Sequence, residues 1–202
     1  MKLYYAPNAC SLAPHIALRE SGLPFALVRV NNATKVTEDG RDFRGINPKG
    51  YVAALELADG TVLTEGPVIL QYLADQAPDS GLLPPAGTLA RWRAQEWLAF
   101  IGSELHAGMG PLFDRELPDE ARARLKQKLF KRLDHVEASL AEGPYLLGGR
   151  FGVVDAYLFT VLRWAKGFAI ELEGWPRLAA FQERVGERAS VIAALEVETR
   201  VL

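Results

Sequence analysis

The only cysteine of this 202-residue chain, Cys10, lies where a predicted strand over residues 2–6 gives way to a predicted helix. Ser11 is placed to cap that helix, and Pro14 is tolerated in its first turn. Unpaired backbone N–H groups and the positive end of a helix dipole stabilise a thiolate relative to a thiol. The sequence therefore predicts a nucleophilic or thiol-binding centre at Cys10. The alternative is a small, inert apolar side chain in a turn, which is common for free cysteines.

The sequence argues against several other kinds of reactive site. Ala13 stands where a Cys-x-x-Cys dithiol needs its second cysteine, so a lone thiol must find its partner sulfur on another molecule. We predict no metal site, because the histidines His15, His106 and His135 are scattered without a second cysteine or a carboxylate cluster. The glycine-rich stretch 148–152 matches neither a nucleophile elbow nor a phosphate-binding loop.

Composition limits the partners and the location. The chain has 23 basic and 25 acidic residues, well mixed along the sequence, for a formal charge of -2, which argues against a nucleic-acid partner. It has no apolar run suited to a signal peptide or a membrane span, so we expect no membrane association. A single cysteine permits no intrachain disulfide, which is typical of a reducing compartment. We therefore expect a cytoplasmic protein.

The elements that would position Cys10 form a small α/β domain over residues 1–78. The helix after Cys10 should end at Gly22, and a strand over 25–30 should pair in parallel with the first strand. Asp59-Gly60 lies between two short apolar runs and predicts a hairpin. A helix should follow from Gly66-Pro67. This order of elements predicts a thioredoxin-like layer.

Residues 79–87 are rich in proline and glycine and are predicted to be a linker. From 88 to 202 the apolar residues recur at helical spacing, which predicts an all-helical second domain. Asp155 falls in the first turn of an almost uncharged helix that begins near Gly152, so we assign it to folding, as an acceptor for backbone N–H groups. The predicted fold class is thus α/β thioredoxin-like followed by all-α.

Several motifs, in this order and at these separations, resemble bacterial beta-class glutathione S-transferases. They are Tyr4-Tyr5-Ala6-Pro7, Ala9-Cys10-Ser11-Leu12, Asn47-Pro48-Lys49-Gly50-Tyr51-Val52, Leu63-Thr64-Glu65-Gly66, Glu104-Leu105-His106, and Tyr145-Leu146-Leu147-Gly148 with Asp155. The resemblance implies a detoxification transferase of glutathione transferase architecture, with glutathione as co-substrate. It also implies a helical domain that shapes the pocket for a small hydrophobic electrophile, and a homodimer.

The resemblance also implies roles for single residues around the sulfur. Cys10 would face the glutathione sulfur and is able to form a mixed disulfide with it. Tyr5 and Ser11 resemble the nearby hydroxyl groups, although Tyr5 is also readable as a core aromatic of the first strand. His106, from the second domain, resembles a residue that lines the thiol and is able to hydrogen-bond a thiolate; the alternative is a structural histidine on a helix face.

The remaining implied residues would hold the ends of the tripeptide. The backbone of Val52 resembles the segment that pairs with the peptide, and Lys35 resembles a contact to the glycyl carboxylate. Glu65 and the N–H of Gly66 would hold the γ-glutamyl end, where the start of the following helix favours a carboxylate. We expect Glu65 to be a buried acidic residue between a strand and a helix.

The chain departs from the family pattern at Ala53, where the family has a cis-proline. A cis bond to a residue other than proline costs about 3–4 kcal/mol. We therefore predict a trans Val52–Ala53 bond and a displaced loop. Ala99 and Ala107 replace polar residues that commonly flank the pocket in the family.

Two modes of catalysis fit the residues: conjugation, in which glutathione is the nucleophile, and glutathione-dependent thiol–disulfide or peroxide reduction through Cys10. The alternative from a different class is a non-catalytic glutathione-binding or redox interaction module that keeps the fold. Ala53, Ala99 and Ala107 are the features that favour this alternative.

Overall fold

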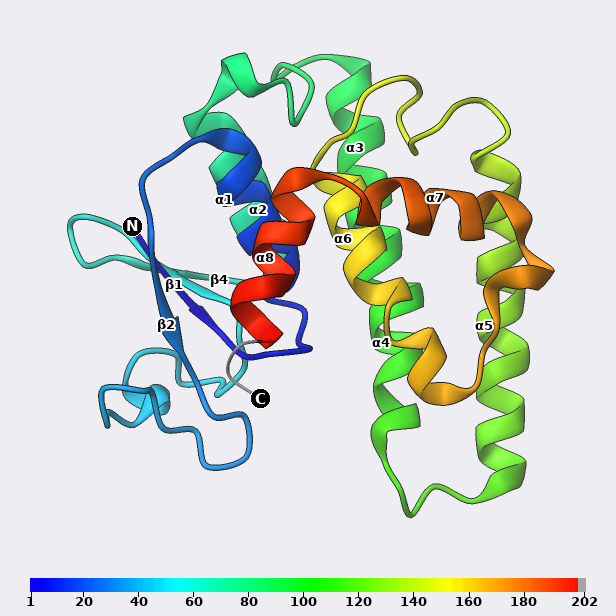
Figure 1. Cartoon of the computed structure of the whole chain (residues 1–202), viewed down its shortest axis with the longest axis horizontal. Helices are drawn as coiled ribbons and strands as arrows, with labels where there is room; N and C mark the ends of the chain where they lie inside the picture. Colours follow the sequence, from blue (N-terminus) through cyan, green and yellow to red (C-terminus); the bar gives the residue numbers. More distant parts are fainter. Residues whose placement is uncertain (200–202) are drawn as a thin grey trace. The chain divides into compact units, whose positions relative to one another are not determined.

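The computed structural model describes residues 1–199 as two compact units, each shown in Figure 1. Unit 1 comprises Met1–Leu83 together with the described part of the segment that starts at Glu187. Unit 2 comprises Pro84–Gly186. The predicted α/β layer and the predicted helical domain are both present, which confirms the expected fold class.

The sheet of unit 1 has four strands in the order β2-β1-β3-β4. Its strands are β1 (Lys2–Tyr5), β2 (Ala26–Arg29), β3 (Ala54–Glu56) and β4 (Val62–Thr64). The pair β1–β2 is parallel, as predicted for a strand–helix–strand unit, and β3 is antiparallel to both β1 and β4. Gly60 has a φ of 87°, so the hairpin turn at Asp59-Gly60 uses the left-handed region that glycine enters without strain.

The α-helices of unit 1 lie on one side of this sheet (Figure 1). They are α1 (Leu12–Ser21), α2 (Gly66–Gln76) and α8 (Ala189–Thr199). The unit also has two short 3-10 turns, η1 (Phe43–Gly45) and η2 (Pro78–Ser80). Helix α1 ends at Gly22, which has a φ of 68°, as predicted.

Successive side chains of β1 point to opposite faces of the sheet, so they pack into two separate apolar layers. Tyr5 packs toward α1, where its ring lies 6.1 Å from that of His15. Tyr4 points to the opposite face, where it packs on Phe43 with ring centroids 5.7 Å apart. Val52 and Ala54 belong to the same buried cluster as Tyr4 and Phe43. The loop that carries Val52 is therefore anchored in the core beneath the sheet.

Helix α8 joins unit 1, whereas the predicted boundaries placed residues 187–202 with the helical domain. Two polar contacts explain the difference. The buried His15 Nδ1 lies 3.4 Å from Glu198 Oε1, and Arg188 makes a two-pronged ion pair with Glu20 at 2.8 and 2.9 Å. Both join α8, or the residue just before it, to α1.

Unit 2 is made of helices and short helical turns. They are α3 (Leu89–Phe100), the π-helix η3 (Ile101–His106), α4 (Ala107–Met109), η4 (Gly110–Phe113), α5 (Asp119–Ser139), α6 (Val153–Leu162), η5 (Ala165–Phe168), η6 (Leu172–Gly174) and α7 (Pro176–Gly186). The Thr88 hydroxyl accepts from the Arg91 amide at 3.1 Å and caps α3.

Helix α6 is the core of unit 2, because all ten of its residues are buried. The Asp155 carboxylate accepts hydrogen bonds from the backbone amides of Leu146 at 2.9 Å and Gly152 at 2.8 Å. It thereby ties the start of α6 to the preceding loop. The assignment of Asp155 to folding is confirmed.

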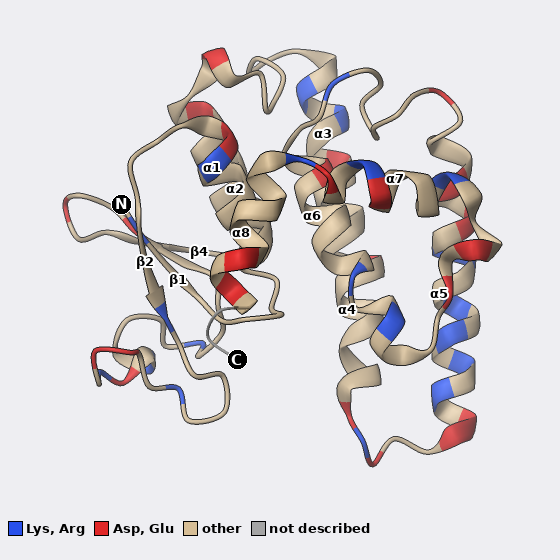
Figure 2. Cartoon of the chain, in the orientation of Figure 1, with Lys and Arg blue, Asp and Glu red and all other residues tan. Residues whose placement is uncertain are grey.

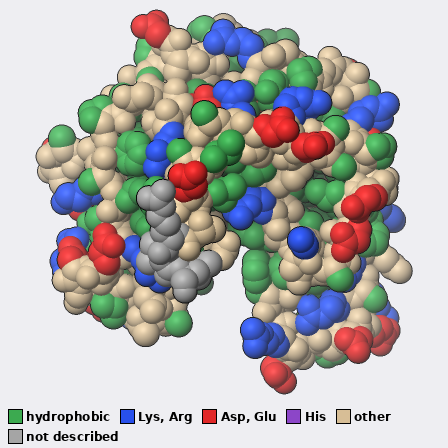
Figure 3. Space-filling view, in the orientation of Figure 1, with side chains coloured by type: hydrophobic (Ala, Val, Ile, Leu, Met, Phe, Trp, Pro, Cys, Tyr) green, Lys and Arg blue, Asp and Glu red, His purple; other side chains and the backbone are tan. Residues whose placement is uncertain are grey.

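Charged side chains of both signs are distributed over both units, and basic residues are densest along α5 (Figure 2). The face shown in Figure 3 likewise mixes apolar, basic and acidic side chains. Within residues 1–199, no helix is long and apolar enough to cross a membrane. The same residues contain no group of three side chains suited to holding a metal ion.

Candidate active site

The turn between β1 and α1 holds Cys10 half-buried, with its thiol aimed at a neighbouring loop. The Cys10 Sγ donates a hydrogen bond of 3.2 Å to the backbone carbonyl of Val52. These two residues are 42 positions apart in sequence. The structure thus brings the predicted sulfur next to the predicted peptide-pairing segment.

Burial and backbone hydrogen bonds shift the pKa of the Cys10 thiol in opposite directions. Burial raises the pKa of the Cys10 thiol to about 11, above its ordinary value of 9.0. Hydrogen bonds from the backbone at Cys10, Ala53 and Ser11 lower this pKa, and the negative charge of Glu65 raises it. Because desolvation outweighs the helix-start amides, the surroundings of Cys10 favour the neutral thiol. The predicted nucleophilic or thiol-binding role of Cys10 stays a prediction.

The Ser11 hydroxyl is fully buried and is engaged with the backbone of the same turn. It accepts from the Ala6 amide at 3.1 Å and donates to the Ala6 carbonyl at 3.3 Å. Ser11 occupies the N-cap position of α1, yet its side chain makes no cap hydrogen bond. These two hydrogen bonds hold the turn that carries Cys10 in its conformation. Its predicted part in catalysis stays a prediction.

Tyr5 is buried with only 4% of its surface exposed, and burial is the main cause that raises its pKa. Its ring packs against His15. This geometry fits the alternative interpretation of Tyr5 as a core aromatic of β1. A role for its hydroxyl beside the sulfur remains a prediction.

The Val52–Ala53 peptide bond is cis, so the predicted trans bond was wrong. The surrounding structure holds this loop at three points. The Asn47 side-chain amide donates to the Tyr51 carbonyl at 2.7 Å, the Cys10 thiol donates to Val52, and Ala54 enters β3 opposite Tyr4. These contacts are tertiary, and the residue type at position 53 does not reveal them.

Glu65 lies at the N-cap of α2, with a φ of 68°. Its side chain is 62% exposed, so the expectation of a buried carboxylate was wrong. It forms an ion pair with Lys49, whose Nζ lies 2.6 Å from Glu65 Oε1 and 3.0 Å from the Thr64 hydroxyl. Gly66 follows as the first residue of α2. The carboxylate and the start of a helix are therefore adjacent and accessible.

Lys49 is a residue that sequence reasoning missed as a site residue. The pairing of Lys49 with Glu65, 16 positions away, is not visible in the local sequence. Lys35 has a φ of 60°, and its Nζ lies 5.7 Å from the centre of the exposed Tyr51 ring. Lys35 is thus placed beside the residue that precedes Val52.

His106 belongs to unit 2, where it ends the π-helix η3 and is half-buried. Its Nδ1 lies 2.7 Å from the Tyr157 hydroxyl. The Trp164 ring packs edge-on against the imidazole at 5.0 Å. Sequence reasoning identified His106 and missed both aromatic partners, which lie more than 50 positions away along the chain.

An aromatic surface continues from His106. Phe113 is 56% exposed, and its ring lies 5.5 Å from that of Trp164 and 4.8 Å from that of Phe168. Met109, four positions before Phe113, is fully buried. Unit 2 therefore offers an aromatic wall, exposed at Phe113 and half-buried at Trp164 and Phe168, that is suited to apolar compounds.

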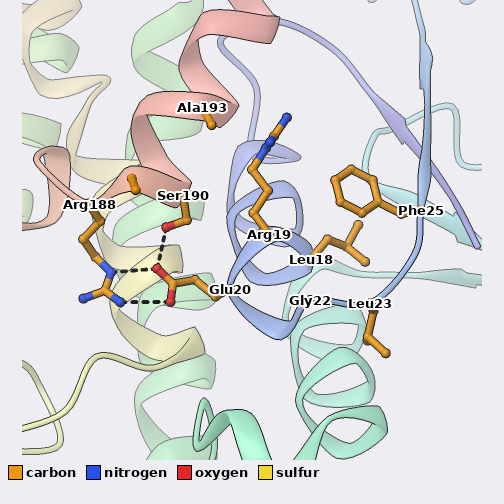
Figure 4. Close-up of a pocket in the computed structure, with 10 residues that line it drawn as sticks. Leu18, Arg19, Glu20, Gly22, Leu23, Phe25, Arg188, Ser190 and Ala193 are labelled. Carbon is orange, nitrogen blue, oxygen red and sulfur yellow. Dashed lines mark hydrogen bonds and ion pairs between the residues drawn. The ribbon is translucent and has the colours of Figure 1, made fainter.

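An open pocket of about 750 Å³ lies at the other end of α1 from Cys10, beside the start of α8 (Figure 4). The Glu20 carboxylate on its wall is paired with Arg188 and with the Ser190 hydroxyl. Its charged groups hold helices together, so we do not assign the candidate site to this pocket.

Comparisons with known proteins agree with this geometry. Family models for the N-terminal and C-terminal domains of glutathione S-transferase match residues 9–76 and 119–184. Glutathione S-transferase GstA of Escherichia coli O157:H7 is 49% identical over 198 residues, covering 98% of both chains. A sphingomonad glutathione S-transferase solved with glutathione has a TM-score of 0.95 at 44% identity, covering 98% of this chain and 99% of that one. A bacterial beta-class enzyme from Sphingomonas chungbukensis has a TM-score of 0.94 at 44% identity, covering 98% of each chain.

Proposed function

The chain belongs to the bacterial beta class of the glutathione S-transferase family, and we propose that it joins glutathione to small apolar electrophiles at a site organised by Cys10. Glutathione is its co-substrate. The main support for a glutathione site at Cys10 is the 3.2 Å hydrogen bond from the Cys10 thiol to the Val52 carbonyl. This contact supports the proposal, because the sulfur lies next to the loop segment to which we assign the tripeptide backbone.

We assign the γ-glutamyl end of glutathione to Glu65 and Gly66. The exposed Glu65 carboxylate is available to the ligand ammonium, and the amides at the start of α2 favour the ligand carboxylate. Lys35, beside Tyr51, takes the glycyl carboxylate. Tyr5 and Ser11 complete the surroundings of Cys10.

The raised pKa of Cys10, about 11, favours conjugation as the main reaction. An ordinary thiol has a pKa of 9.0, about two units lower, so glutathione reaches the thiolate form more easily than Cys10 does. The glutathione thiol first loses its proton to solvent. Its sulfur then forms a bond to the electrophilic carbon while the leaving group departs with its electron pair. The aromatic wall of Phe113, Trp164 and Phe168 supports an apolar second substrate.

Thiol transfer is the second candidate, and the lone, half-buried Cys10 favours it. In this mode the Cys10 sulfur attacks a mixed disulfide and releases the other sulfur as a thiolate. Glutathione then attacks the Cys10–glutathione disulfide, so that oxidised glutathione leaves and Cys10 is reduced again. The non-catalytic alternative is not favoured, because the relatives that span the whole chain are named transferases.

A pair of steady-state assays tests these proposals on the wild type and on Cys10→Ala. With a chloronitrobenzene, we expect Cys10→Ala to retain conjugation within about tenfold, because the nucleophile is glutathione itself. With a mixed disulfide, we expect the same variant to lose all thiol transfer. Loss of conjugation in Cys10→Ala would place the chemistry on Cys10, and wild-type inactivity in both assays would support the non-catalytic module.

We further propose that the protein is a cytoplasmic homodimer. Each unit exposes large apolar side chains: Tyr51 (71%) and Val68 (48%) in unit 1, and Leu89 (71%) and Trp92 (61%) in unit 2. Such side chains gain stability when a second copy covers them. The single cysteine supports a reducing location. Sedimentation of the wild type and of Leu89→Ser with Trp92→Ser tests the dimer, which should dissociate in the double variant.

A further inference from the structure

The pocket of about 750 Å³ beside the end of α1 contains one cation that is not used to join α1 to α8 (Figure 4). Two arginines and one glutamate line this pocket. The Glu20 carboxylate is taken up by Arg188, at 2.8 and 2.9 Å, and by the Ser190 hydroxyl. The positive charge of Arg19 is therefore left over on the wall of the pocket.

Arg19 is held in a fixed position by two uncharged rings. Its Nε donates to His15 Nε2 at 2.9 Å, and its guanidinium carbon lies 5.8 Å from the centre of the Phe25 ring. His15 is fully buried, and its other ring nitrogen lies 3.4 Å from Glu198, so the imidazole separates this carboxylate from Arg19. Within residues 1–199, the two terminal nitrogens of Arg19 have no hydrogen bond or ion pair.

A guanidinium held in this way is suited to a carboxylate. The terminal N–H groups of arginine match the two oxygens of a carboxylate, and the two parallel hydrogen bonds that form are charge-assisted. A side chain that is already fixed loses little conformational freedom when it binds a ligand. Arg19 is therefore a pre-organised anchor for an organic anion.

The rest of the wall is suited to an apolar group. Four apolar side chains line the pocket, from α1, the segment after α1, and α8: Leu18, Leu23, Phe25 and Ala193. In the view of Figure 4, the Arg19 side chain lies between Ala193 on α8 and Phe25. The volume is within the range of about 300–1,000 Å³ that is typical of small-molecule sites. The lining thus combines one cation with an apolar surface.

We propose that this pocket is a second ligand site, which binds a carboxylate carried on a compact apolar body, and that the bound molecule bridges α1 and α8. The carboxylate pairs with Arg19 of α1. The apolar body lies against Leu23, Phe25 and Ala193. Because the ligand needs both helices in place, it stabilises their contact by mass action. The proposal goes beyond the proposed function, since it uses no residue of the Cys10 turn.

A pair of aromatic probes tests the charge requirement. 1-Naphthoate has the carboxylate, and 1-naphthamide has the same rings without the charge. By calorimetric titration of the wild type, we expect naphthoate to bind about tenfold more tightly than naphthamide or better, the effect of charge-assisted hydrogen bonds. Equal affinities for the two compounds, or no binding of naphthoate, would overturn the proposal.

Four variants locate the probe. Arg19→Met should weaken naphthoate binding about tenfold or more. Arg29→Met is its matched control, because it removes another half-buried arginine of unit 1 that does not line this pocket. Ala193→Phe fills the pocket without removing the contact of Arg19 with His15, and it should abolish binding. Ile192→Phe, at the exposed neighbouring position, should not. Unchanged affinity in Ala193→Phe would refute the site, even if Arg19→Met does not fold.

Hydrogen exchange tests the bridge between the helices. Saturating naphthoate should slow amide exchange over residues 189–199 in the wild type and not in Ala193→Phe, with α6 of unit 2 as the unaffected reference. Binding without slower exchange of α8 would overturn the bridging role. Conjugation is assayed in parallel, and Ala193→Phe should keep kcat/KM within about twofold. A wild type that binds naphthoate at Arg19 but is inactive with glutathione would contradict the proposed function and support the second site.

Discussion

Two opposing effects act on the pKa of the Cys10 thiol, and their balance sets how readily the sulfur ionises. Burial raises its pKa, whereas backbone hydrogen bonds at Cys10, Ala53 and Ser11 lower it. Burial dominates, so the fold stabilises the neutral thiol. That contribution to stability is complete below the ordinary thiol pKa of 9.0 and is lost as the pH rises through about 11.

This balance predicts slow alkylation of Cys10 at neutral pH. With a pKa of about 11, only about one thiol in ten thousand is ionised at pH 7. The rate with iodoacetamide should rise about tenfold per pH unit until it levels off near pH 11. Glu65→Gln should increase the rate modestly, since it removes a negative charge that raises this pKa. A rate that levels off near neutral pH would contradict the prediction.

Lys49 has a measurable share in glutathione binding if the Lys49–Glu65 pair orients the carboxylate. Lys49→Gln should raise the KM for glutathione about two- to fivefold, the range expected for an exposed ion pair, and leave kcat unchanged. The effect should shrink at high salt. Lys2→Gln is the control, because it breaks a similar 2.6 Å pair with Glu56 on the same sheet. An equal change in both variants would exclude a specific role for Lys49.

Residue-level predictions from the sequence succeeded where the cause is local and failed where burial decides. The left-handed conformation of Gly22 and the capping role of Asp155 follow from neighbours a few positions away. The raised pKa of the Cys10 thiol depends on burial, and the carbonyl that accepts its hydrogen bond lies 42 positions away in sequence. The exposure of Glu65 and the cis bond at Ala53 likewise depend on tertiary packing, and no local pattern encodes either of them.

At the level of elements, α6 relies on one carboxylate at its start. Asp155→Ala should lower the free energy of unfolding by about 2–4 kcal/mol, because it leaves the buried amides of Leu146 and Gly152 without their acceptor. Urea unfolding measures this loss. Glu120→Ala, which removes an exposed pair with Arg124, should change stability by about 0.5 kcal/mol or less. Similar losses in the two variants would show that the Asp155 contacts are not important for folding.

The elements themselves were largely predictable. The hairpin at Asp59-Gly60, the parallel β1–β2 pair and the buried α6 all follow from turn residues and apolar periodicity. Periodicity also predicted α8, but it did not predict which unit α8 joins. An apolar helix face is complementary to many surfaces, and the choice is made by particular contacts such as His15 with Glu198. For the same reason the sequence did not reveal the contact of His106 with Tyr157.

At the level of the whole molecule, the attachment of α8 to α1 depends on a buried histidine. His15 is fully buried, and its ring lies between Tyr5 and Phe25. His15→Ala should cost about 2–4 kcal/mol and leave Glu198 buried without a partner. Hydrogen exchange over residues 189–199 should then become faster than exchange in unit 2.

A surface variant of the same helix provides the control. Ile192 is 45% exposed on α8, so Ile192→Ala should leave hydrogen exchange of that helix nearly unchanged. Unaltered protection of α8 in His15→Ala would mean that apolar packing alone holds the helix in place.

The discontinuity of unit 1 also bears on how the protein is made. Domains generally fold as units while the chain emerges from the ribosome, with the N-terminal one first. Here the first 83 residues leave the ribosome without the helix that covers α1, and that helix is synthesised only after Gly186. The helical unit, although translated second, is therefore the first to have all of its residues available. The scaffold that supports the Cys10 turn is therefore complete only after α8 has been synthesised.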